Sequence, residues 1–192
     1  NQIEKHYPDG SKFIIFPMDT AFKRRLEWEY ISTAPVNDQV TGTRDTHLNN
    51  PEVRIAVDAV RANDLITTWQ SFYSALNEFI TDKDKGLGKK EDKQVGQFFI
   101  EFKDSDITDS HSTTSSVKDA AAARINKDIK NKLLMYLWQD VQGTSALRGS
   151  TTLFDSKISS YDSLYNLYGM DKVFSDTFIN DFLKPSLHKY PY

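Results

Sequence analysis

The chain has 192 residues, a formal net charge of −3 at pH 7 and no cysteine. This length is enough for one domain with a real core, or for a small core with an appendage. The lack of cysteine excludes disulfides, a thiolate nucleophile and a thiolate metal site. The nearly balanced charges give no broad attraction to nucleic acid, so any DNA contact would be local. No apolar run approaches the length of a membrane span, and we expect a cytoplasmic protein.

The start of the chain is predicted to contain β-structure. Residues 11–16 form a short apolar run after the turn signal at 8–10, which predicts a buried strand. Residues 26–31 alternate large apolar and acidic side chains, which predicts a second strand. Between them lie Arg24 and Arg25, whose guanidinium groups stay charged and can bind a phosphate or a carboxylate. The alternative interpretation of this pair is a solvated basic turn.

The pattern becomes helical after residue 64. Apolar residues at steps of three and four predict a core-facing helix over 65–80, with Asn63 or Asp64 as its N-cap. Residues 95–102 could form a short strand or a tight helical turn. The Ser, Thr and Asp content of residues 104–116 predicts a flexible loop.

The strongest helix is predicted over residues 117–141. Its apolar stripe consists of Val117, Ala121, Ile125, Ile129, Leu133, Tyr136, Leu137 and Val141, and Ser115 or Ser116 can cap it. Two further helices are expected over 162–168 and 172–183, separated by Gly169 and stopped by Pro185. The spacing of the aromatic residues Trp69, Phe98, Phe99, Tyr136 and Trp138 places them in the core. The expected fold is therefore mainly α, a helical bundle with a small α/β N-terminal portion.

The stretch MDTAFKRRLEWEYIS, residues 18–32, resembles the segment that follows sensor 1 in the McrB-type AAA+ NTPases of modification-dependent restriction systems. Further stretches at 91–100, 129–141 and 174–183 fit the same family in the expected order. The resemblance implies the C-terminal part of such a protein. Residues 1–50 would be the remnant of the AAA+ α/β core, and residues 51–192 would be the helical lid and C-terminal helices.

The resemblance also implies roles for three residues. Arg24 and Arg25 occupy the positions of the arginine finger and the adjacent phosphate-sensing arginine, although which is which stays open. Such arginines stabilise charge on the γ-phosphate of a neighbouring subunit's nucleotide. Lys93 falls where the family begins its contact between lid and core, and it could approach a nucleotide phosphate. A capping or solvent-facing lysine is the alternative for Lys93.

The sequence also departs from the family. It has no G-x-x-x-x-G-K-[ST] phosphate loop and no acidic pair at the end of an apolar strand. GTP or ATP with Mg²⁺ is therefore expected as a cofactor of a full-length protein, and none is expected for the isolated chain. The partners that the resemblance implies are a homo-oligomeric ring, a McrC-like nuclease subunit and, indirectly, DNA, with no membrane.

Two other functions stay open. The chain could be a non-enzymatic helical module that binds protein or DNA. Alternatively, Pro8-Asp9 and Glu101-Phe102-Lys103 could mimic the elements of a metal-dependent nuclease. That second option is disfavoured, because those nucleases need their carboxylates on adjacent strands and the intervening chain here is largely helical. The four histidines lack the spacing of a ligand pair, so no metal site is predicted.

Overall fold

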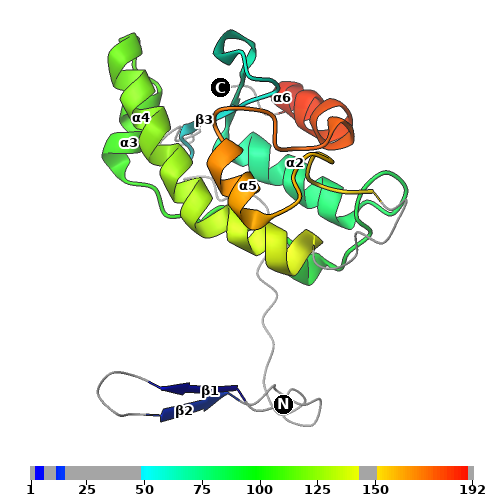
Figure 1. The fold of residues 1–192 in the computed structure, drawn as a ribbon. Helices are drawn as coiled ribbons and strands as arrows, with labels where there is room; N and C mark the ends of the chain where they lie inside the picture. Colours follow the sequence, from blue (N-terminus) through cyan, green and yellow to red (C-terminus); the bar gives the residue numbers. More distant parts are fainter. Residues whose placement is uncertain (1–2, 7–11, 16–48, 143–150, 190–192) are drawn as a thin grey trace, which may run out of the picture. The chain divides into compact units, whose positions relative to one another are not determined.

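The computed structural model describes residues 3–6, 12–15, 49–142 and 151–189 (Figure 1). The chain divides into two compact units, residues 1–32 and residues 33–192. In the first unit, strands β1 (Ile3–His6) and β2 (Lys12–Ile15) pair antiparallel. The strand predicted over 11–16 is thus confirmed, whereas the one predicted over 26–31 lies outside the described residues. The mainly α fold with a small β portion is also confirmed. The predicted boundary at residue 50, which concerns an AAA+ core, stays a prediction.

The second unit begins with a strand pair that the sequence analysis missed. Strand β3 (Glu52–Ile55) pairs antiparallel with β4 (Leu65–Thr68), and a short 3-10 turn, η1 (Arg61–Asn63), lies between them. The helix predicted over 65–80 is therefore wrong at its start. Three of the four residues of β4 are β-branched, which favours an extended chain once a partner strand is present.

Helix α2 (Trp69–Thr81) follows β4 directly. Its N-cap is Thr68, whose hydroxyl accepts a hydrogen bond from the backbone N–H of Ser71, and not Asn63 or Asp64. The helix is central to the core, because it buries residues on most of its circumference. Trp69 is fully buried, as predicted, and Phe79 packs edge-on against Phe178 with ring centroids 5.5 Å apart.

The long helix predicted over 117–141 is confirmed, and it begins two residues earlier. It comprises α4 (Ser115–Asp128) and the π-helical segments η3 (Ile129–Leu134) and η4 (Leu137–Gln142). The predicted serine cap is wrong, because Thr114 holds the N-cap position without a side-chain bond. Val117 is also 36% exposed and does not belong to the buried stripe.

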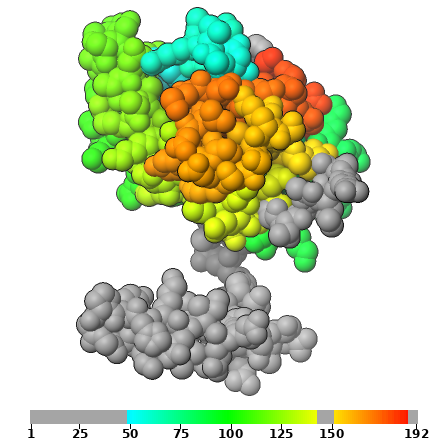
Figure 2. Space-filling view, viewed as in Figure 1, coloured from blue at the N-terminus to red at the C-terminus, as the bar shows by residue number. Residues whose placement is uncertain are grey.

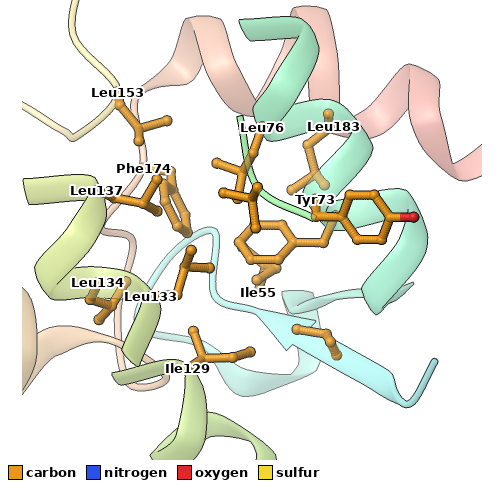
Figure 3. Close-up of a cluster of buried hydrophobic side chains, with 14 of the residues drawn as sticks. Ile55, Tyr73, Leu76, Ile129, Leu133, Leu134, Leu137, Leu153, Phe174 and Leu183 are labelled. Carbon is orange, nitrogen blue, oxygen red and sulfur yellow. The ribbon is translucent and has the colours of Figure 1, made fainter. Parts of the chain in front are cut away.

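The buried stripe explains why this helix contains π-turns. Six of its fully buried residues recur at intervals of four, namely Ala121, Ile125, Ile129, Leu133, Leu137 and Val141, and Leu134 next to Leu133 is also fully buried. In a continuous α-helix a step of four residues advances the stripe by about 40°, so five steps would turn it to the opposite face. Turns of the wider π type rotate the stripe back and keep these side chains in the core. Figure 3 shows Leu133, Leu137 and Phe174 within this interior.

Residues 95–102 form no strand, and the predicted alternative of a tight turn is found at Gly96–Phe99, where the Phe99 N–H donates to the Gly96 carbonyl at 3.0 Å. Side-chain amides take the place of a neighbouring strand. The Nδ2 of Asn77 donates to the Val95 carbonyl at 2.8 Å, and the Val95 N–H donates to the Asn77 Oδ1 at 2.6 Å. Asn49 binds three backbone groups further along in the same manner, namely the carbonyls of Gln97 and Ile100 and the N–H of Phe102.

Residues 104–116 are not the loop that was predicted, because helix α3 (Asp104–Ser110) lies there. Ile107 is buried in the core, and the buried carboxylate of Asp106 forms an ion pair with Arg124 of α4. These long-range contacts stabilise a helix that its composition alone would not favour. Among the aromatic residues assigned to the core, Phe99, Tyr136 and Trp138 pack against it, but Phe98 is 53% exposed.

The remaining helices complete the unit. Helix α5 (Tyr161–Leu167) begins at a capping box of Ser160 and Ser163 and ends before Gly169, whose φ of +78° suits glycine. The π-helical segment η6 (Phe178–Leu183) packs against α2 and runs into α6 (Lys184–Lys189). Pro185 therefore does not stop the helix as predicted, because η6 runs directly into α6 and the chain stays helical past residue 185. No helix within the described ranges is long and apolar enough to cross a membrane.

Candidate functional site

The residues predicted to act on a nucleotide are not brought together in the described structure. Arg24 and Arg25 lie outside the described residues. Lys93 ends the 3-10 turn η2 (Glu91–Lys93), where its backbone carbonyl accepts a hydrogen bond of 2.9 Å from the Tyr136 hydroxyl. The roles assigned to these three residues therefore stay predictions.

A different group of residues forms a polar pocket of about 470 Å³. Its walls come from the β3–β4 region, from the helix α4 with the first turn of η3, and from the end of α5. Figure 2 shows these three segments, in cyan, green and orange, meeting at the surface. The pocket is lined by Arg54, Arg61, Asp64, Asp119, Ala122, Ala123, Asn126, Lys127, Lys130, Tyr165, Tyr168, Gly169 and Met170. Lys93 does not contribute to it.

One wall of the pocket is an arginine pair that shares a carboxylate. The Nη1 of Arg54 lies 2.7 Å from Oδ1 of Asp119, and the Nη2 of Arg61 lies 3.2 Å from the same oxygen. The hydrogen bond from Arg54 is the main reason why the pKa of Asp119 is lowered. Asp119 therefore stays ionised, orients Arg54 and offsets part of the positive charge.

Helix α4 and the first turn of η3 contribute two lysines to the pocket, Lys127 and Lys130, one helical turn apart. Neither ammonium group forms an ion pair with a carboxylate of the described residues. The amine of Lys130 lies 5.2 Å from the centroid of the Tyr165 ring, a cation–π distance. Burial lowers the pKa of Lys130, so its charge lacks full solvation. An anion in the pocket would stabilise that charge.

Several hydrogen-bonding groups of the pocket residues are left without a partner. Among the described residues, the Nε of Arg54, the Oδ1 of Asn126 and the hydroxyl of Tyr168 are shielded from water and form no hydrogen bond. Tyr168 is only 2% exposed, and burial raises the pKa of its hydroxyl, which therefore stays protonated. Buried polar groups nearly always have a partner. Three exceptions among the residues of one pocket make it a candidate binding site.

The pocket is suited to binding more than to metal chemistry. Its two carboxylates belong to Asp119, which is held by arginines, and to Asp64. Burial raises the pKa of Asp64, against the opposing effect of Arg61 and Arg54. No group of three His, Asp or Glu side chains that could hold a metal ion occurs among the described residues. The excess of cations over carboxylates indicates an anionic ligand.

The sequence analysis missed this pocket because its residues are spread over more than one hundred positions. Arg54 lies on strand β3 and Arg61 in the turn η1, neither of which was predicted, and no role was predicted for Lys127 or Lys130. The only local signal was Gly169, which was predicted correctly as the separator of two helices. The Nδ2 of Asn126 lies 3.0 Å from where a Cβ on Gly169 would be, so a side chain there would crowd the pocket wall.

Comparison with known proteins gives one distant similarity. The chain is 26% identical over 178 residues to the type II restriction enzyme BsuMI component YdiS of Bacillus subtilis (strain 168). The aligned region covers 87% of this chain and 39% of that protein, so the chain spans about two fifths of the length of this relative. No family model matches the chain, and no solved structure matches it. The chain is thus a mainly α protein similar to a restriction enzyme component.

Proposed function

We propose that this chain is the C-terminal, lid-bearing portion of a McrB-like AAA+ GTPase or ATPase. Such a protein forms rings and powers a partner nuclease in DNA restriction, and this portion is not competent alone. The observation that carries the broader part of the proposal is the similarity to a restriction enzyme component over 87% of this chain. The finer assignment rests on the match of residues 18–32 to the family segment.

In this proposal the catalytic contribution of the chain comes from Arg24 and Arg25. A positioned guanidinium group stabilises the charge that develops on the transferred γ-phosphate, and it acts across the interface of the ring. The phosphate loop and the Mg²⁺ ligands would come from other parts of the full-length protein. Lys93 would approach a phosphate of the same nucleotide from the lid side.

The test uses the full-length parent protein and measures turnover separately from nucleotide affinity. Arg24→Ala and Arg25→Ala should lower turnover by roughly a thousandfold in at least one case. Nucleotide affinity should stay nearly unchanged, because the arginine binds mainly the charge of the transition state. Lys23→Ala is the matched control, since it removes a neighbouring positive charge without removing a guanidinium group.

Mixed rings then decide whether the arginine acts in trans. Subunits with Arg24→Ala should inhibit wild-type rings in proportion to their share of the mixture. A structural arginine would instead lower the yield of folded protein and leave the remaining rings active. Turnover close to wild type in both single variants would refute the catalytic role. A parent protein without any nucleotide hydrolysis would favour the non-enzymatic interaction module.

A further inference from the structure

The pocket between β3, α4 and α5 has two properties that the proposed AAA+ function does not use. It holds four cationic side chains and two carboxylates, so it attracts an anion. It also has three shielded hydrogen-bonding groups without a partner, on Arg54, Asn126 and Tyr168. A simple halide or a bare carboxylate would satisfy the charge but would leave the carbonyl oxygen of Asn126 without a donor. The ligand must therefore combine an anionic group with hydroxyl or amino groups.

The distribution of charge limits the ligand to a single anionic group. Asp119 already occupies one terminal nitrogen of each arginine. The free positive charge is thus concentrated at Lys127 and Lys130, whose Cβ atoms lie roughly 5–6 Å apart as neighbours on a helix face. That spacing suits two ammonium groups on one tetrahedral anion. A polyphosphate would extend toward Asp64 and Asp119, which would repel it.

We propose that this pocket binds a small phosphomonoester that carries hydroxyl groups, such as a sugar phosphate. The phosphate lies between the ammonium groups of Lys127 and Lys130. A hydroxyl of the ligand donates to the Oδ1 of Asn126, and the hydroxyl of Tyr168 donates to a ligand oxygen. The site is independent of the proposed nucleotide chemistry, since neither Arg24 nor Arg25 belongs to it.

The position of the unpartnered atoms also indicates how the ligand enters. The Oδ1 of Asn126 and the hydroxyl of Tyr168 are shielded from water. In this proposal the turn formed by residues 168–170 moves away from α4 when the ligand binds, which gives the ligand access to both groups. Gly169 lies in this turn with a φ of +78°, and Met170 at the turn is 63% exposed. The ligand therefore displaces this turn and satisfies the groups behind it.

The experiment is isothermal titration calorimetry on the full 192-residue chain with three probes. Ribose 5-phosphate tests the proposed class, ribose removes the phosphate, and ATP with Mg²⁺ adds two phosphates and an adenine base. Ribose 5-phosphate should bind saturably, ribose should show no saturation, and ATP should bind at least tenfold more weakly than ribose 5-phosphate. Tighter binding of ATP would overturn the assignment of a monoester, and no saturable binding of ribose 5-phosphate would overturn the site.

Two pairs of variants locate the binding in this pocket. Lys130→Gln should weaken the affinity for ribose 5-phosphate at least tenfold, whereas Lys132→Gln, an exposed lysine on the same helix outside the pocket, should not change it. Tyr168→Phe should weaken it several-fold, whereas Tyr136→Phe should not. Equal effects within either pair would refute the assigned contacts. Circular dichroism melts of each variant show whether it is folded at the temperature of titration.

These outcomes are distinguishable from those of the proposed function. The titration measures binding by the isolated chain and involves neither turnover nor ring assembly. A chain that fails to bind ribose 5-phosphate can still complete the active site of a ring through Arg24 and Arg25. Conversely, full activity of the arginine variants would leave the pocket and its ligand unaffected.

Discussion

Asn49 is the residue whose replacement should show most clearly how this fold is held together. It is 7% exposed, and its backbone lies in the left-handed region with a φ of +49°. Its Nδ2 donates to the carbonyls of Gln97 and Ile100 at 2.8 and 2.7 Å, and its Oδ1 accepts from the N–H of Phe102 at 2.9 Å. One side chain thus binds three backbone groups of a segment that has no strand partner.

The expected cost can be separated into two parts by two substitutions. Asn49→Gly keeps a residue that tolerates a positive φ and removes the three hydrogen bonds. At a net value of about 1 kcal/mol each, their loss lowers the free energy of unfolding by roughly 3 kcal/mol. Asn49→Ala removes the same bonds and adds the left-handed penalty of about 1–2 kcal/mol, which gives roughly 4–5 kcal/mol in total.

The assay is urea denaturation followed by circular dichroism and tryptophan fluorescence, with the free energy of unfolding extrapolated to water. Trp69 is a suitable probe, because its indole N–H donates to the carbonyl of Gln97 at 2.8 Å. Asn49→Gly should also speed hydrogen exchange of the Phe102 amide. If Asn49→Gly remains within about 0.5 kcal/mol of wild type, the amide does not hold this segment and the argument is wrong.

Three further outcomes are expected. Leu133→Ala should lower the free energy of unfolding by roughly 2–5 kcal/mol, because Leu133 is fully buried, and an unchanged melt would refute the core assignment. Asp155→Asn should destabilise at pH 7 and lose its effect as pH falls below about 4. Burial raises the pKa of Asp155, but the hydrogen bonds and charges of Lys172 and Lys157 together outweigh burial and leave the pKa lowered; a constant difference in pH-dependent melts would contradict this. Tyr168→Phe should not lower stability, whereas Tyr136→Phe should cost about 1 kcal/mol in urea denaturation, because only Tyr136 has a hydrogen-bond partner.

The sequence by itself determined the long helix and most of α2, but not the short helix α3. The apolar stripe from Ala121 to Val141 predicted the long helix, and Gly169 marked the end of the helix predicted over 162–168. Both signals could be found in the sequence because they are local in the chain. The strict spacing of four residues even contained the signal for the π-turns, since an α-helix cannot keep such a stripe on one face. Lys93 was singled out from a family resemblance, and neither its role nor those of Arg24 and Arg25 follows from the described residues.

Only the tertiary structure decided the elements and the site that depend on distant partners. Strand β4 forms because β3 pairs with it. Helix α3 is stabilised because Arg124 binds the carboxylate of Asp106. The segment 95–102 is held in place because two asparagine side chains replace a neighbouring strand. The pocket likewise assembles residues from 54 to 170. The free energy of each of these features comes from groups far apart in the chain, and local sequence patterns therefore do not record it.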